Sequence, residues 1–416
     1  VEVFGQNVIV DLSYQEGQKV VFFPSDGQLS LEYATDNNLV RKKDENGNNI
    51  GGYMDAEKRN VTAIRLRGEK SEGLILPIET LAKYTDISKL KDGDQITVLG
   101  GHEICQKYIP RGRNRSRSNG NSSNKKNKFQ KETVSYPFFE EHKDTAQLAY
   151  NMSAFKPGDT IYITRKLHGT SARTMKTVKV TKKNSKLRKF LHMQPKVTRE
   201  VSVVSGSRRV VLKDMTKNDG YYSDNGFRKK YHDLLKDKLP EGAEIFYEIV
   251  GYTNETTPIM GSVSNKGVKE KEFTKKFGDT TTFSYGCKPG ENEMYVYRMT
   301  MTTADGTVVE VPWETVEVWC DKLGIKHVPD LEKFIFTTPE DLKERVNKYL
   351  DGMPADEIGK THIAEGVVVR IDNRATFTAY KDKVFEFKVI EGIAKDTSDV
   401  PDMEEAEELF EETLNE

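Results

Sequence analysis

A strongly basic segment divides this chain of 416 residues into two parts. Residues 111–131 read RGRNRSRSNGNSSNKKNKFQK, which includes eight Lys or Arg, no acid and one aromatic residue. Such a composition cannot bury enough apolar surface to order itself. We therefore predict a flexible basic linker over residues 111–136, with one domain on each side, residues 1–110 and residues 137–400. Residues 401–416 are predicted to form an acidic C-terminal tail.

The part before the linker has the pattern of a small β domain. Its short apolar runs are separated by Gly, Asp, Asn and Pro, as in QKVVFFPSDG, NVTAIRLRG, SEGLILP and GDQITVLGG. Several short strands with closely spaced turn signals favour a small β-barrel or sandwich.

The part after the linker mixes strands and helices. Six segments have the composition of strands, residues 159–169, 199–212, 243–252, 293–301, 364–371 and 383–390. Three segments have the composition of helices, residues 227–239, 313–324 and 339–350. This mixture favours an α+β domain that is built on antiparallel sheets.

Composition excludes several other classes of protein. No stretch reaches 18 apolar residues and no basic region precedes an apolar one at the start. We therefore expect no membrane span, and we expect that a secretory signal is absent or was already removed. Cys105, Cys287 and Cys320 lie far apart and match neither a disulfide framework nor a zinc pattern. We therefore expect a cytoplasmic protein without a membrane partner, and no feature of the chain indicates an oligomer, so we expect a monomer.

Four lone charges lie inside apolar runs that have the pattern of strands: Lys166, Glu248, Glu365 and Lys388. A charge in such a run is costly to bury unless it is paired or binds a ligand. Lys166 follows the run DTIYITR, and Gly169 permits a tight turn and a close approach of the backbone to a ligand. A lysine in this position can attack phosphorus once its amine is deprotonated, which burial and neighbouring cations favour.

The order of these pieces resembles the covalent nucleotidyltransferase superfamily, which contains ATP-dependent ligases and GTP-dependent capping enzymes. KLHG is similar to motif I, SGSRRV to motif Ia, FYEIVG to motif III, YVYRM to motif IIIa, EGVVVR to motif IV and FEFKVI to motif V. The resemblance covers residues 155–395. His168 and Thr170 beside the lysine are similar to RNA ligases, whereas DNA ligases and capping enzymes more often have Asp in motif I.

Two positions depart from the superfamily pattern. Motif V usually reads Lys-x-Lys, and Glu386 occupies the place of the first lysine when Lys388 is taken as the second. Motif I often has Arg five residues after its lysine, where this chain has Ser171, with Arg173 two residues later.

The arrangement of the two parts resembles one branch of the superfamily. Only 28 residues follow Lys388, too few for the OB domain that follows motif V in DNA ligases and capping enzymes. RLRGEKSEGLILP and VVFFPSDGQLS instead resemble the N-terminal OB-like module of ATP-dependent RNA ligases that seal 3′-OH/5′-phosphate breaks. The resemblance thus implies an N-terminal OB-like β-barrel followed by a nucleotidyltransferase domain.

The resemblance implies an ATP-dependent RNA ligase that acts through lysyl-AMP and RNA-adenylate intermediates. Lys166 would attack the α-phosphate of ATP, and Lys388 would neutralise that phosphate. Glu365 would hold hydrated Mg²⁺, or Mn²⁺ in its place. The partner would be RNA with 3′-OH and 5′-phosphate ends.

Further residues would bind the nucleotide. The resemblance implies that Glu248 holds the ribose hydroxyls and that Arg208 or Arg209 contacts the ribose or the RNA 5′-phosphate. Tyr297, or Tyr295 two residues earlier, would stack on adenine, and the glycine of motif I belongs to the same binding site.

Two other functions remain as alternatives. A GTP-using capping guanylyltransferase is disfavoured because no OB domain follows motif V. A non-catalytic RNA-binding protein on a ligase fold is disfavoured by the intact Lys166, Glu248 and Glu365, and mildly favoured by Glu386. Residues 176–199, with nine Lys or Arg and no acid, form either a solvated insertion or an RNA-binding surface.

Overall fold

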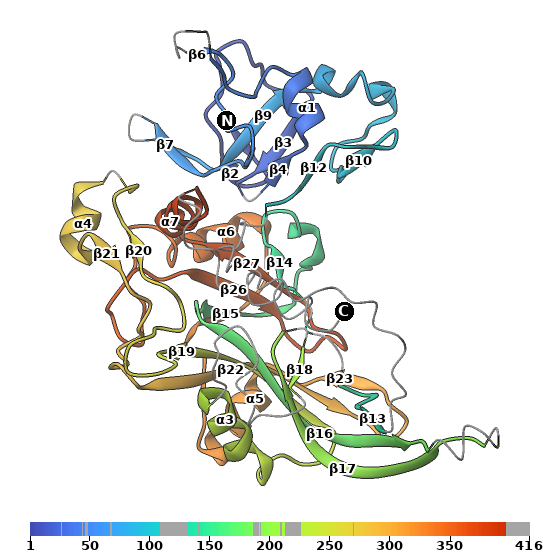
Figure 1. Ribbon diagram of the computed structural model, residues 1–416. Helices are drawn as coiled ribbons and strands as arrows, with labels where there is room; N and C mark the ends of the chain where they lie inside the picture. The colour runs from blue at the N-terminus through green and yellow to red at the C-terminus, as the bar shows by residue number, and fades with distance from the viewer. Residues whose placement is uncertain are drawn as a thin grey trace.

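A computed structural model shows two units, one from each side of the basic segment (Figure 1). The structure describes residues 1–25, 27–43, 45, 49–66, 69–108, 132–139, 142, 144–185, 191, 193–208, 210–212, 226–268 and 270–396. The predicted linker up to residue 131, Arg209 and the acidic tail lie outside these residues. Residues 132–135 of the predicted linker form a strand that pairs in the second unit, so this unit's sheet begins before residue 137.

The N-terminal unit consists of short strands joined in pairs around their own apolar core. Its elements are β1 (Glu2–Val3), β2 (Gln6–Asn7), β3 (Val20–Pro24), β4 (Gly27–Leu29), α1 (Leu31–Asp36), β5 (Lys42–Lys43), β6 (Asn49–Gly51), β7 (Ile64–Leu66), β8 (Glu69–Ser71), β9 (Gly73–Pro77), two 3-10 helices (Ile78–Leu81 and Ile87–Lys89), β10 (Val98–Leu99), β11 (His102–Glu103) and β12 (Cys105–Lys107). Leu29, Tyr33 and Leu81 are fully buried at the centre of this core. The described strands form two-stranded sheets that do not close into a barrel, so the OB-like barrel stays a prediction.

The larger sheet of the second unit is eight-stranded and almost wholly antiparallel. Its strands are β13 (Glu132–Ser135), β16 (Thr170–Lys183), β17 (Lys196–Gly206), β18 (Val211–Leu212), β19 (Ala243–Gly251), β22 (Asn292–Thr302), β23 (Val308–Glu310) and β24 (Lys326–His327). The main path runs β18-β17-β16-β19-β22-β23, with β13 beside β16 and β24 parallel to β22. Every residue of β19 is buried, as expected for a central strand covered on both faces.

The second sheet has five strands in the order β14-β27-β26-β15-β25. These strands are β14 (Ala146–Gln147), β15 (Thr160–Lys166), β25 (Asp330–Ile335), β26 (Gly366–Ile371) and β27 (Ala379–Lys383). All pairs are antiparallel except β14 with β27. Side chains of both sheets, such as Ile163 and Ile249, share one hydrophobic core. The predicted α+β class with antiparallel sheets is therefore confirmed.

The three predicted helices are confirmed as α3 (Gly226–Lys236), α5 (Trp313–Leu323) and α6 (Pro339–Asn347). Helix α6 begins with Thr338, whose side chain accepts a hydrogen bond from the Asp341 backbone, and Pro339 occupies its first turn. Helix α5 ends at Gly324, which has a left-handed backbone. The remaining elements are a 3-10 helix (Met152–Ala154), α4 (Lys271–Phe277) and the pair β20 (Val263–Ser264) and β21 (Thr280–Thr281).

One predicted strand is wrong. Residues 383–390 do not form a strand, because Phe385–Asp396 form the helix α7, and the preceding strand β27 ends at Lys383. Phe385, Glu386 and Phe387 are all buried in consecutive positions of this helix. The first residues of this helix, Phe385 to Val389, alternate apolar and charged side chains, which is the period of a strand, so this alternation could not distinguish the helix from a strand.

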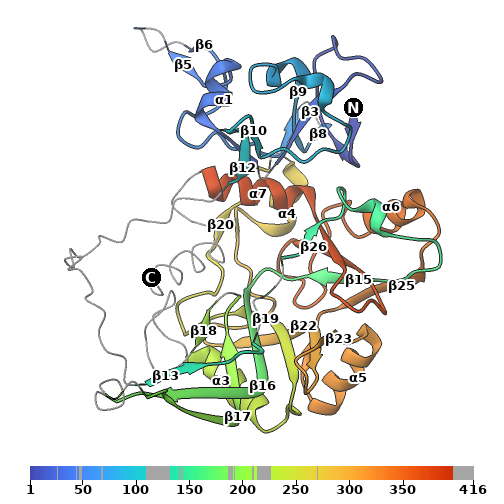
Figure 2. The same ribbon diagram turned by 90° about the vertical axis from the view of Figure 1, so that its right-hand side faces the viewer.

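Helix α7 lies between the two units. In both views it runs directly beneath the N-terminal unit and above the remainder of the second unit (Figures 1 and 2). Phe4 and Phe22 of the N-terminal unit also pack their rings against Tyr150, with ring centroids 5.7 and 6.3 Å away. No helix in the described part of the chain is long and apolar enough to span a membrane.

Candidate active site

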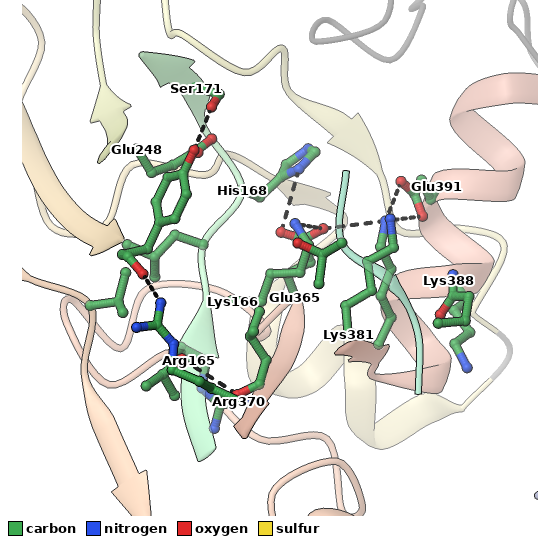
Figure 3. Close-up of a pocket in the computed structure, with 18 of the residues that line it drawn as sticks. Arg165, Lys166, His168, Ser171, Glu248, Glu365, Arg370, Lys381, Lys388 and Glu391 are labelled. Carbon is green, nitrogen blue, oxygen red and sulfur yellow. Dashed lines mark hydrogen bonds and ion pairs between the residues drawn. The ribbon is translucent and has the colours of Figure 1, made fainter. Parts of the chain in front are cut away.

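A polar pocket opens where the five-stranded sheet, β16, β19 and β22, helix α7 and the N-terminal unit meet (Figure 3). Six of the residues predicted from the sequence line it: Lys166, Arg208, Glu248, Tyr297, Glu365 and Lys388. The N-terminal unit contributes Gln6, Pro24, Ser25 and Lys107 to the same wall. Residues far apart in the sequence are thus gathered in one place, as the order of the motifs predicted.

Lys166 and Glu365 form the centre of the pocket. Lys166 is the last residue of β15 and pairs in register with Gly366, so Glu365 comes directly before the facing strand. The Lys166 Nζ lies 2.9 Å from Glu365 Oε1, and the Glu365 side chain is only 2% exposed. In Figure 3 the two side chains point toward one another. The strand pairing therefore fixes the distance between the predicted nucleophile and the predicted metal-binding carboxylate.

Glu365 is held as a carboxylate by cations. Lys383 Nζ lies 3.2 Å from the same Oε1 that contacts Lys166. Burial raises the pKa of Glu365, but Lys166, Lys383 and His168 outweigh burial and hold this pKa below its usual value. Oε2 is buried and has no hydrogen-bond partner among the described residues, with His168 Nδ1 3.9 Å away. An oxygen left in this state can accept a bond from a ligand, water or metal ion.

The turn after Lys166 joins two strands of different sheets. The Gly169 N–H donates to Glu248 Oε1 at 3.0 Å, and the His168 N–H donates to the Tyr285 hydroxyl at 2.6 Å. A Cβ at position 169 would lie 2.3 Å from the carbonyl oxygen of Ile249. Gly169 is thus required for the close approach of the turn to β19, a packing reason that the ligand-based prediction did not include.

Tyr297 faces the pocket because of an irregularity in β22. Arg298 pairs with Phe246 and Val296 with Tyr247, which leaves Tyr297 as the extra residue of a β-bulge. Its hydroxyl lies 2.8 Å from Ser171 Oγ. Ser171, at the position where motif I often has Arg, thus forms a hydrogen bond with Tyr297, the residue predicted to stack on adenine. Of the two tyrosines, Tyr297 lines the pocket and Tyr295 does not, and the stacking of either on adenine stays a prediction.

The arginines of motifs I and Ia are divided between the pocket and the core. Arg208 follows β17, lines the pocket and forms an ion pair with Asp144. Arg173 is buried, lies 3.2 Å from Glu244 and stacks its guanidinium 3.7 Å from the centre of the Phe139 ring. Arg173 therefore holds the sheet together and does not replace the arginine expected at Ser171.

Lys388 lies at the pocket edge, but its amine is engaged by acids. Lys388 lies on the helix α7 and not on the strand predicted over residues 383–390. Its Nζ lies 2.9 Å from Glu72 Oε1 and 3.3 Å from Asp382 Oδ1. The prediction that Lys388 binds the α-phosphate is untested, and the structure offers a better placed pair of lysines.

Lys381 and Lys383 are the pocket lysines that sequence reasoning missed. They alternate along β27, both line the pocket, and Lys383 Nζ lies 2.6 Å from Glu391 of α7. Burial, together with Lys383, Lys166 and Lys107, lowers the pKa of Lys381 to about 8. The signal was present, because Lys381-Asp382-Lys383 has the Lys-x-Lys spacing of motif V without any departure.

Metal-binding residues are few in this pocket. Glu365 is its one acid with an oxygen that lacks a hydrogen-bond partner among the described residues. Within the same described part of the chain, one group of three possible ligands exists elsewhere, formed by Glu317, His327 and Asp330, none of which lines the pocket. The pocket thus suits an ion that keeps most of its water, such as Mg²⁺, and not a fully protein-bound metal.

Comparison with known families identifies this arrangement. The family model for RNA ligase matches residues 159–390, from the start of β15 into α7. The chain belongs to the RNA ligase family. The match covers the pocket residues of the second unit from Lys166 to Lys388 and ends within the helix that contacts the N-terminal unit.

Solved structures with the fold of this RNA ligase include several of the Naegleria gruberi RNA ligase. A mutant with ATP and Mn aligns with a TM-score of 0.53 and 15% identity over 92% of this chain and 91% of that chain. A second mutant, with AMP and Mn, aligns with a TM-score of 0.53 and 16% identity over 92% and 90%. The ligase with PPi aligns with a TM-score of 0.52 and 16% identity over 92% of this chain and 89% of that chain. A search of curated proteins gave no match.

Proposed function

We propose that this chain is an ATP-dependent RNA ligase that joins a 3′-OH end to a 5′-phosphate end of RNA. One observation carries the proposal: the Lys166 amine lies 2.9 Å from a buried carboxylate in a pocket whose lining includes the cations Lys381, Lys383 and Arg208. Such a pocket suits a polyphosphate and a lysine nucleophile. The Naegleria gruberi ligase of the same fold has been solved with ATP and with AMP, which supports the choice of nucleotide.

In the first step, the Lys166 ammonium beside Glu365 gives one proton to solvent, and the neutral amine attacks the α-phosphorus of ATP. A P–N bond forms, the bond from that phosphorus to the bridging oxygen breaks, and pyrophosphate leaves with the bonding electrons. The nitrogen of the new P–N bond gives a second proton to solvent. Lys381 and Lys383 would neutralise charge on the phosphates, and Glu365 would orient the amine by its hydrogen bond.

The second and third steps transfer AMP and seal the RNA. An oxygen of the RNA 5′-phosphate attacks the AMP phosphorus, the P–N bond breaks, and Lys166 recovers its proton. The 3′-OH then attacks the 5′-phosphorus of RNA, and AMP leaves. Arg208 is placed to contact the RNA 5′-phosphate or the ribose, because it lines the same pocket as Lys166.

Nucleotide recognition would use Glu248 and Tyr297. Both line the pocket on neighbouring strands of the large sheet. We assign the ribose hydroxyls to Glu248 and adenine stacking to Tyr297, whose ring is held by the bond to Ser171. The half of the pocket nearest Lys381 and Lys383 is left for the phosphates.

A divalent ion fits beside Glu365. Its buried Oε2 lacks a hydrogen-bond partner among the described residues, and a carboxylate is the ligand that Mg²⁺ or Mn²⁺ prefers. When bound, such an ion would offset negative charge on the phosphates. Glu365 would then serve both the ion and Lys166 with its two oxygens.

Labelling with nucleotide tests the proposed function against its alternatives. The wild-type protein is incubated separately with α-labelled ATP and α-labelled GTP and is then analysed on a denaturing gel. Label from ATP, followed by sealing of a nicked RNA, is the expected result. Label from GTP would indicate a capping guanylyltransferase, and no label from either would indicate an RNA-binding protein on a ligase fold.

Lys381 predicts a pH dependence of nucleotide binding. With a pKa of about 8, its amine is cationic below that pH and neutral above it. Because the triphosphate favours the cationic form, affinity for a non-hydrolysable ATP analogue should fall about tenfold between pH 7 and pH 9. Lys381→Met should bind more weakly at pH 7 and show a flatter profile in calorimetric titrations. A wild-type profile as flat as that of the variant would contradict this role.

A further inference from the structure

The two units are joined at the pocket edge by three partly buried charged residues, Glu72, Lys388 and Asp382. Lys388 Nζ lies 2.9 Å from Glu72 Oε1 of the N-terminal unit and 3.3 Å from Asp382 Oδ1 of β27. The Lys388 and Glu72 side chains are only 11% and 16% exposed. Charges shielded to this degree are held in place, because any movement would leave one of them buried without its partner.

The two acids that contact Lys388 are both held by strands: Glu72 lies between β8 and β9, and Asp382 lies in β27. The Glu72 N–H donates to the carbonyl of Asn7 at 2.8 Å, which fixes its position between β8 and β9. Asp382 lies between Lys381 and Lys383, and successive side chains of a strand point to opposite faces. Lys381 and Lys383 therefore face the pocket while Asp382 faces Lys388.

The positive charge of Lys388 is already paired with two carboxylates, so Lys388 is a poor candidate to bind a phosphate. Two carboxylates surround its amine, so the three groups together carry a net negative charge. Burial lowers the pKa of Lys388, but Asp382 and Glu72 outweigh burial and raise this pKa above its usual value, so the amine stays protonated. Its neighbours on both sides are protein groups of opposite sign, which is the environment of a structural cation.

We propose that Glu72 is a positioning residue for nucleotide binding: through Lys388 and Asp382 it holds β27 so that Lys381 and Lys383 stay directed at the phosphates. This inference rests on the proposed function, because it assumes that the pocket binds ATP. The N-terminal unit is thereby linked to the first chemical step, although it lies outside the matched family region, residues 159–390.

The test is the KM for ATP of Glu72→Gln in the full-length protein, measured by lysine adenylylation. This change keeps the size of the side chain and removes its charge. We expect KM to rise at least fivefold with kcat within twofold of wild type. Glu2→Gln is the matched control, because Glu2 also forms an ion pair with the second unit, at Lys343 of α6, but at an exposed position. The control should leave KM and kcat unchanged.

A double variant checks that Glu72 acts through Lys388. In a Lys388→Met background, Glu72→Gln should add less than a twofold change in KM, and thermal melts establish that each variant is folded. An unchanged or lower KM in Glu72→Gln would overturn the proposal, and a lower KM would show that Lys388, once released, binds phosphate itself. A full fivefold effect of Glu72→Gln in the Lys388→Met background would overturn it as well. If wild type accepts no label from ATP, the proposed function fails instead.

Discussion

Lys166→Ala should abolish the covalent AMP adduct, lowering its rate of formation by at least about a thousandfold. Lys166 is the lysine of motif I. It is the last residue of β15, pairs with Gly366 and has its amine 2.9 Å from Glu365. Alanine cannot form the P–N bond, and arginine cannot replace lysine because its guanidinium stays protonated. The measurement is transfer of label from α-labelled ATP to protein on a denaturing gel.

The same variant separates the chemical steps. Sealing of RNA that already carries AMP on its 5′ end needs no free lysine, so Lys166→Ala should retain much of this activity. Lys333→Ala is a matched control, because Lys333 lies on the neighbouring strand β25 and is half exposed outside the pocket. Normal adduct formation by Lys166→Ala would exclude Lys166 as the nucleophile.

Glu365→Gln should reduce adduct formation by about a hundredfold while the protein stays folded. The amide keeps the shape of the side chain but removes the charge that faces Lys166 and Lys383. Two amines would then share a buried site without their carboxylate, and the binding of a divalent ion would be weakened as well. Single-turnover adenylylation over a Mg²⁺ titration measures both effects.

Glu391→Gln is the control for charge alone. Glu391 lies on α7, 2.6 Å from Lys383, whereas Glu365 lies 2.9 Å from Lys166 itself. We expect less than a tenfold effect from this change, because it weakens the placement of one lysine only. If Glu391→Gln were as damaging as Glu365→Gln, the effect of Glu365 would be general electrostatics and not a direct role at Lys166.

Local patterns were enough to predict the strands that carry the site. β15, β19, β22 and β26 are rich in β-branched or aromatic residues, and the cost of burying a charge in or beside such a run identified Lys166, Glu248 and Glu365. The choice between Tyr295 and Tyr297 could not be made from alternation, because a bulge in β22 interrupts the period of two. A bulge depends on the pairing partner, which the single strand does not reveal.

Local patterns failed at helix α7. Its first residues alternate apolar and charged side chains as a strand does, and the helix lies directly beneath the N-terminal unit (Figure 1). Taking FEFKVI as a strand directed the prediction to Lys388, whereas the strand that lines the pocket, β27, carries Lys381 and Lys383. The pair of Lys388 with Glu72 spans 316 residues, a separation at which no local spacing rule applies.

The pairing of β15 with β26 also determines when the enzyme becomes competent during its synthesis. Lys166 leaves the ribosome about two hundred residues before Glu365, Lys381 and Lys383. At typical translation rates of 5–20 residues per second, roughly ten seconds or more separate the synthesis of Lys166 from that of the other three residues. The N-terminal unit has its own core and can fold during this interval. A nascent chain therefore exposes the partner edge of β15 until β26 is synthesised, and the proposed adenylylation would begin only after nearly the whole second unit has emerged.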